Sequence, residues 1–150
     1  MKTMIASLML LTSLATSAAH WTEIKASWEY MPGDDTDCGE AETTLTRAGK
    51  IEIWGCGERA ELTATPAQLR KINRIMDKIM VHARSSYVCK DQSVQDYSWD
   101  YKIKVSATQW LPVFMSDGNF TCARVGAARY FEQLDEAMNE LSPDTDGTIQ

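Results

Sequence analysis

Histidine is scarce in this chain of 150 residues, which contains two, His20 and His82. Mechanisms that combine a nucleophile, a histidine and an acid need a histidine at their centre. With so few histidines and no other catalytic motif, we expect that the protein is not an enzyme. Basic residues are also in the minority, with 15 Lys and Arg against 21 Asp and Glu. Nucleic acids and anionic lipids repel such a chain. We therefore expect no nucleic-acid partner.

Long apolar runs are missing after the first 14 residues. Lys2, the apolar residues 5–14 and the small residues 17–19 have the order of a removable signal peptide. We interpret residues 1–19 as that signal, and its shortness and single lysine favour a bacterial protein that is periplasmic or secreted. Its removal leaves 14 cations and 21 acids, a net charge of −7. No later run approaches the roughly 18 apolar residues of a membrane span, so we expect no membrane insertion of the mature chain.

The closely spaced cysteine pairs of zinc and redox sites are also missing. The four cysteines are far apart, at Cys38, Cys56, Cys89 and Cys122. In an oxidising compartment, an even number of cysteines predicts two disulfides and no free thiol. Three pairings are possible, and we favour Cys38–Cys56 with Cys89–Cys122 because each joins segments in the same half of the expected fold. In a eukaryotic host, Asn119-Phe120-Thr121 would be a glycosylation sequon.

Residues 20–150 contain no repeat or linker and predict a single domain with a flexible tail from about residue 143. Alternating apolar and polar residues predict strands, which we place at 23–30, 43–47, 50–54, 97–105, 110–115 and 120–123. Thr65-Pro66-Ala67-Gln68 is a capping box that begins a helix ending near residue 83. A second amphipathic helix is predicted over 127–141. This order predicts an α+β fold, an antiparallel sheet of about five to six strands with two amphipathic helices packed on one face.

Several surface features are candidates for partner binding. One is the acidic loop between the first two strands, with Asp34, Asp35, Asp37 and Glu40. Trp54 and Trp110 lie near predicted turns, where exposed tryptophans can anchor a protein interface. Asp117 begins an Asp-Gly turn. By contrast, we expect Tyr97, Trp99 and Tyr101 to pack in the core, because they alternate on one face of a strand.

The two predicted helices carry opposite charges. Arg70, Lys71, Arg74 and Lys78 lie on the polar side of the first helix, and Glu132, Asp135, Glu136 and Glu140 lie on the second. These charges either form two solvated faces or create a dipolar surface that orients the protein on a partner. Arg70, Arg74 and Lys78 are therefore further partner-binding candidates.

Metal binding is an alternative with few candidate ligands. Cleavage after residue 19 would make His20 the first residue, whose amine and ring could hold copper together with His82. The acidic loop does not match a calcium-binding loop, because Gly39 occupies the third ligand position after Asp35 and Asp37. We expect no cofactor, with copper and calcium as the alternatives.

The order of strands, helix, strands and helix resembles that of small bacterial metalloprotease inhibitors of the emfourin type, over most of the mature chain. Together with export, disulfides and acidity, it favours a non-catalytic binding protein. We expect a periplasmic inhibitor or immunity protein that blocks a secreted or delivered hydrolase or toxin by protein–protein contact, with a rigid turn or loop entering the target's cleft. The alternatives are a small copper-binding periplasmic protein that uses His20, and a structural subunit of an envelope assembly.

Overall fold

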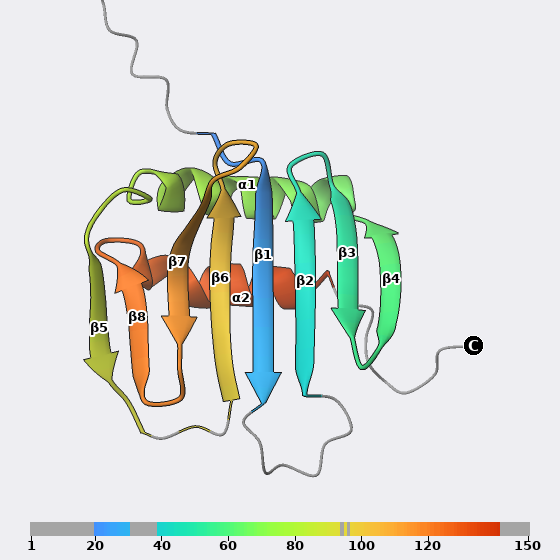
Figure 1. Ribbon diagram of the computed structural model, residues 1–150. Coiled ribbons are helices and arrows are strands. Elements are labelled where there is room, and N and C mark those ends of the chain that lie inside the picture. Colours follow the sequence, from blue (N-terminus) through green and yellow to red (C-terminus); the bar gives the residue numbers. More distant parts are fainter. Residues whose placement is uncertain (1–19, 31–38, 94, 96, 142–150) are drawn as a thin grey trace, which may run out of the picture.

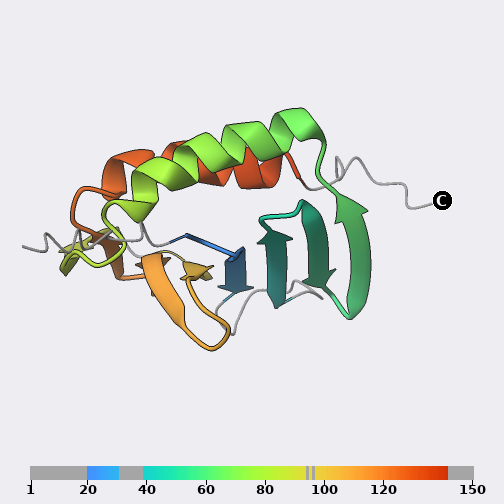
Figure 2. The ribbon, with the colours of Figure 1, turned by 90° about the horizontal axis from the view of Figure 1, so that it is seen from above.

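The computed structural model describes residues 20–30, 39–93, 95 and 97–141. They form an eight-stranded antiparallel sheet with two helices on one face (Figures 1 and 2). The strands are β1 (Glu23–Tyr30), β2 (Glu40–Thr46), β3 (Lys50–Gly55), β4 (Glu58–Thr63), β5 (Tyr87–Asp91), β6 (Tyr97–Lys104), β7 (Trp110–Ser116) and β8 (Phe120–Arg124). The helices are α1 (Pro66–Met80) and α2 (Phe131–Asn139), with a short 3₁₀ turn, η1 (Ala128–Tyr130), before α2.

The strand order is β4-β3-β2-β1-β6-β7-β8-β5. Four strands run outward from the centre to β4, and α1 then crosses behind the sheet to the opposite edge, where β5 begins (Figure 1). The chain returns to the centre as β6 and runs outward again through β7 and β8. All seven strand pairs are antiparallel. Because neighbouring strands alternate in direction, the last residues of β1, β3 and β7 lie at the same end of the sheet (Figure 1).

The expected number of about five to six strands is wrong, because the sheet also has β4 and β5 as separate edge strands. All six residues of β4 are exposed, and four of the five residues of β5 are exposed. Neither strand therefore carries the alternation of buried and exposed residues by which a half-buried strand is recognised in a sequence. Charged side chains on both strands suit an edge, where they discourage pairing with other chains.

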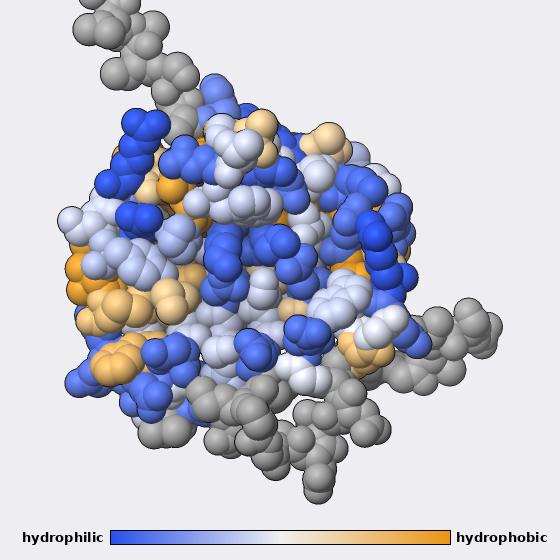
Figure 3. Space-filling model, viewed as in Figure 1, coloured by the Kyte–Doolittle hydropathy of each residue, from blue (hydrophilic) through white to orange (hydrophobic). Residues whose placement is uncertain are grey.

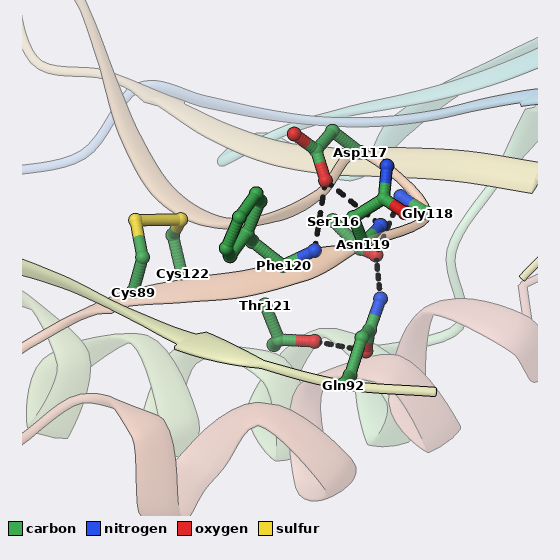
Figure 4. The surroundings of a disulfide bond; sticks show 9 residues. All are labelled: Cys89, Gln92, Ser116, Asp117, Gly118, Asn119, Phe120, Thr121 and Cys122. Carbon is green, nitrogen blue, oxygen red and sulfur yellow. Dashed lines mark hydrogen bonds between the residues drawn. A yellow bond between two sulfur atoms is a disulfide. The ribbon is translucent and has the colours of Figure 1, made fainter. Parts of the chain in front are cut away.

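The expectation of two disulfides is also corrected: the structure describes one, Cys89–Cys122. Cys38 lies outside the described residues, and no cysteine within them is a free thiol. Cys89 on β5 is directly opposite Cys122 on β8, with their Cα atoms 3.9 Å apart (Figure 4). The sequence analysis favoured this pairing. The bond ties the edge strand β5 to its neighbour.

Helix α1 begins with the predicted capping box. The backbone N–H of Gln68 donates to Thr65 Oγ1 (3.2 Å), and the N–H of Thr65 donates to Gln68 Oε1 (2.9 Å). Gln68 Nε2 also donates to the carbonyl of Glu140 (2.8 Å), so the cap connects the start of α1 to the end of α2. Helix α2 begins later than predicted, because the 3₁₀ turn precedes it and Tyr130 provides no side-chain cap.

The core lies between the sheet and the helices. Ile24, Leu45 and Ile103 are fully buried there, as are Ile72 and Ile79 of α1. Among the described residues, no helix combines the length and apolar character needed to cross a membrane.

The helices cover the upper and middle parts of the strands and leave the lower ends free (Figure 1). The expectation that Tyr97, Trp99 and Tyr101 all lie in the core therefore holds for Tyr101, which is 1% exposed. Trp99 is partly buried against the core, and Tyr97 is 37% exposed. The difference arises because the last two are nearer the uncovered end of β6.

Candidate partner-binding surfaces

A hollow of about 360 Å³ lies on the face of the sheet that the helices leave open. Its central row crosses five strands in register: Trp54 is opposite Glu42, which is opposite Ser27, and Asp100 and Met115 continue the row on β6 and β7. Below this row, the hollow is lined by Glu29, Glu40, Ser98 and Asp117. We call these nine residues the acidic hollow. Figure 3 looks onto this face and shows mostly hydrophilic residues across its middle.

The acidic hollow has an excess of negative charge. Its carboxylates are those of Glu29, Glu40, Glu42, Asp100 and Asp117. Lys25 Nζ lies 2.9 Å from Glu42 Oε1, and Lys102 contacts Asp100. Glu29 and Glu40 are directly opposite each other on β1 and β2, a placement of like charges that destabilises a sheet.

A tight turn holds Asp117 at one end of the acidic hollow. Its Oδ1 accepts hydrogen bonds from the backbone N–H groups of Asn119 (3.0 Å) and Phe120 (2.8 Å) (Figure 4). Both bonds favour the ionised carboxylate, so the pKa of Asp117 is lowered from its ordinary value. Gly118 provides the left-handed backbone that the turn requires, with φ of +90°. The hollow thus has a fixed negative group at this end.

The structure brings together three of the residues that the sequence singled out. Glu40, Trp54 and Asp117 come from different parts of the chain, and all three line the acidic hollow. Trp54 is 39% exposed, which suits an interface anchor. Asp34, Asp35 and Asp37 lie outside the described residues. Trp110 is partly buried, with the ammonium groups of Lys25 and Lys104 5.5 and 5.3 Å from its ring centroid.

The basic candidates lie on the helical side of the molecule, away from the acidic hollow. Arg70, Arg74 and Lys78 are exposed on α1 and line a groove of about 380 Å³ with Gln133 and Glu136 of α2. They follow one another at four-residue intervals, where like charges destabilise a helix slightly. Lys71 pairs with Glu140 (2.7 Å). The molecule therefore presents a negative hollow and a positive row on opposite sides.

The two histidines have separate surroundings. His20 Nδ1 lies 3.2 Å from a guanidinium nitrogen of Arg47. The ring of His82 stacks on Tyr130, with centroids 6.5 Å apart, and packs so closely on Gly126 that a Cβ there would be 2.5 Å from it. Across the described ranges, no three His, Cys, Asp or Glu side chains form a group that could hold a metal ion.

A second hollow, which the sequence analysis missed, lies at the lower end of the sheet on the helical side. It has a volume of about 390 Å³ and is lined by Trp28, Gln92, Gln95, Tyr97, Trp99, Thr121, Phe131, Asp135 and Asn139. We call it the aromatic recess. A signal for it was present in the sequence, because the aromatic residues of β1 and β6 gather toward one end of each strand. Alternation alone assigned these residues to the core.

Comparisons of this chain with protein-family models, with curated proteins and with solved structures find no match.

Proposed function

We propose that this protein is an exported, non-catalytic binding protein that blocks a hydrolase or toxin by docking through the acidic hollow. The observation that carries the proposal is that Trp54, Glu40 and Asp117 line one hollow. A partly exposed tryptophan beside a concave, charged surface is typical of the centre of a protein interface. Strands and a tight turn support these side chains, so the surface is preorganised for a partner.

The charge of the acidic hollow favours a partner that presents lysine or arginine side chains. The five carboxylates of the acidic hollow would attract such side chains and speed association. A disulfide in the fold suits an oxidising compartment, which agrees with the interpretation of residues 1–19 as a signal peptide. We therefore infer that the protein acts in the periplasm or after secretion.

The test begins with capture of partners by oxidised residues 20–150 from envelope and secreted fractions. A captured hydrolase or toxin is purified, and its inhibition and affinity are then measured with variants. We expect Trp54→Ala to weaken binding at least about tenfold, the size of effect found at interface anchors. Phe120→Ala is the matched control, since Phe120 is a similarly exposed aromatic residue, at 44%, that does not line the acidic hollow.

Two results would contradict the proposal. If the captured partner binds Trp54→Ala and Phe120→Ala equally well, the acidic hollow is not the docking surface. If the partner keeps its full activity in the complex, the protein is not its inhibitor. Raising the salt concentration should slow association with the native protein, because charges on the two surfaces steer the encounter.

A further inference from the structure

The aromatic recess shares Trp28 and Trp99 with the lining of the hollow on the open face, and its other lining residues are its own. Trp28 and Trp99 form its floor, directly opposite each other on β1 and β6. Helix α2 forms one wall with Phe131, Asp135 and Asn139. A volume of about 390 Å³ lies within the range of roughly 300–1,000 Å³ typical of small-ligand pockets.

Packing against the core holds the aromatic rings of the recess in place. The Trp99 ring is stacked on Phe131, with centroids 4.5 Å apart and an angle of 14° between the planes. The Trp28 ring meets Tyr101 edge to face at 6.1 Å and 82°. Both tryptophans are partly buried against the core and still line the recess. Aromatic faces carry negative electrostatic potential and attract cations.

The amide groups of the recess are largely engaged with other protein groups. Gln92 Nε2 donates to the hydroxyl of Ser116 and, at 3.5 Å, to Gln95 Oε1. Gln92 Oε1 accepts from the hydroxyl of Thr121 (Figure 4). Asn139 Nδ2 donates to Asp135 Oδ2 at 3.3 Å. A neutral ligand that needs both donors and acceptors, such as a sugar, would find few of these groups available.

Asp135 differs, because its carboxylate keeps unused acceptor capacity. Its Oδ1 accepts the hydroxyl of Tyr101 at 2.6 Å and its Oδ2 accepts Asn139, whereas each carboxylate oxygen can accept about two hydrogen bonds. Of the described residues that line the recess, Asp135 is the one carboxylate, and none is Lys or Arg. The recess therefore combines one negatively charged acceptor with several aromatic rings.

We propose that the aromatic recess binds an organic cation, an alkylammonium or guanidinium group. Aromatic rings attract the charge, and the Asp135 carboxylate neutralises it, the combination found where proteins recognise ammonium ligands. The cation can belong to a free small molecule or to a lysine or arginine side chain. This site goes beyond the proposed function, because it uses the other face of the sheet and does not require an inhibited partner.

The experiment compares two ligands of the same shape and different charge. Choline carries a quaternary ammonium, and 3,3-dimethyl-1-butanol replaces its nitrogen by carbon. The five tryptophans give five indole N–H signals in a ¹⁵N-labelled protein, which are followed during titration after assignment. We expect choline to shift the signals of Trp28 and Trp99, and to bind about fivefold or more tightly than the neutral alcohol. The signal of Trp54, at the far end of the acidic hollow, should stay in place.

Two variants and a third ligand complete the test. Asp135→Asn keeps an oxygen acceptor for the Tyr101 hydroxyl but removes the charge, and should reduce the preference for choline over the alcohol to near one. Glu132→Gln is the control, because it makes the same charge change on α2 at an exposed residue outside the recess. Titration with Nα-acetyl-lysine methylamide identifies the source of the cation: tighter binding than choline indicates a protein side chain, and weaker binding a small molecule.

The proposal is overturned if choline and the alcohol shift Trp28 and Trp99 equally, or if neither ligand shifts them. It is also overturned if Glu132→Gln weakens choline binding as much as Asp135→Asn does, since the effect would then come from overall charge. Thermal melts of both variants confirm that each is folded at the titration temperature. Neither outcome depends on the acidic hollow, so failure here leaves the proposed function standing.

Discussion

The part of the sheet that the helices cover and the part that they leave uncovered consist of the same alternating strands, but they differ in how deeply their side chains are buried. On β1, Ile24 and Ala26 are fully buried, whereas Trp28 farther along is only partly buried. On β6, exposure rises from 0% at Ile103 to 37% at Tyr97. One end of each strand forms core, and the other end lines a recess. Alternation therefore reports which face a residue is on, while the length of the covering elements decides whether that face is buried.

The uncovered end follows from simple dimensions. Strands β1 and β6 have eight residues each, or about 27 Å at 3.4 Å per residue. The two helices pack side by side across the strands (Figure 1), and each is about 10 Å wide. Together they cover roughly 20 Å of strand length, which leaves about two residues per strand beyond them. Trp28 and Trp99, the third residues from those strand ends, lie at the margin of this cover, where they are partly buried and form the floor of the aromatic recess.

The largest expected effect comes from the covered part. Ile103→Ala removes a side chain that is fully buried beneath the helices, and should lower the free energy of unfolding by about 3–4 kcal/mol through lost burial and a cavity. Urea denaturation measures this loss. Leu62→Ala on β4 is the control, because Leu62 is 36% exposed and should cost less than half as much. Equal losses would mean that burial beneath the helices does not decide how much a side chain contributes to stability.

An intermediate effect is expected at the edge strand β5. Replacing both Cys89 and Cys122 by serine removes a cross-link 33 residues apart in sequence, which should cost about 3 kcal/mol. Part of the lost stability should be confined to β5, so amide hydrogen exchange should become faster on β5 than on β1 and β6. Uniformly faster exchange across the whole sheet would show instead that β5 unfolds together with the core.

Much of the fold could be predicted from the sequence, because several elements carry their own signals. The capping box at Thr65 begins α1 as predicted, and the alternation over 23–30 marks β1. The edge strands β4 and β5 were missed as separate strands because almost all of their residues are exposed. Strand order could not be inferred, because it depends on which distant strands pair at the centre, β1 with β6.

Individual residues of the acidic hollow were predicted from the sequence, but the surface that they form together was not. Glu40, Trp54 and Asp117 were chosen for acidity, exposure and turn chemistry, and only the pairing of β3, β2, β1, β6 and β7 shows that they line one hollow. The aromatic recess was missed for a different reason. Gln92 and Asp135 are ordinary polar residues in a sequence, and their role emerges when α2 is placed beside β6 and β8.

The smallest expected effect lies in the turn at Asp117, beyond the helices. Backbone hydrogen bonds lower the pKa of its carboxyl in the folded protein, so the unfolded chain binds the proton more readily. The stabilisation is complete above the ordinary pKa of about 4 and is lost as the pH falls through the lower, folded value.

In Asp117→Asn, an amide oxygen can accept the same bonds without titrating, so stability should fall less steeply below pH 4. Urea denaturation between pH 2 and 6 measures this slope. Asp91→Asn on β5 makes the same charge change elsewhere, and an equal change in its slope would mean that the turn is not the origin of the effect.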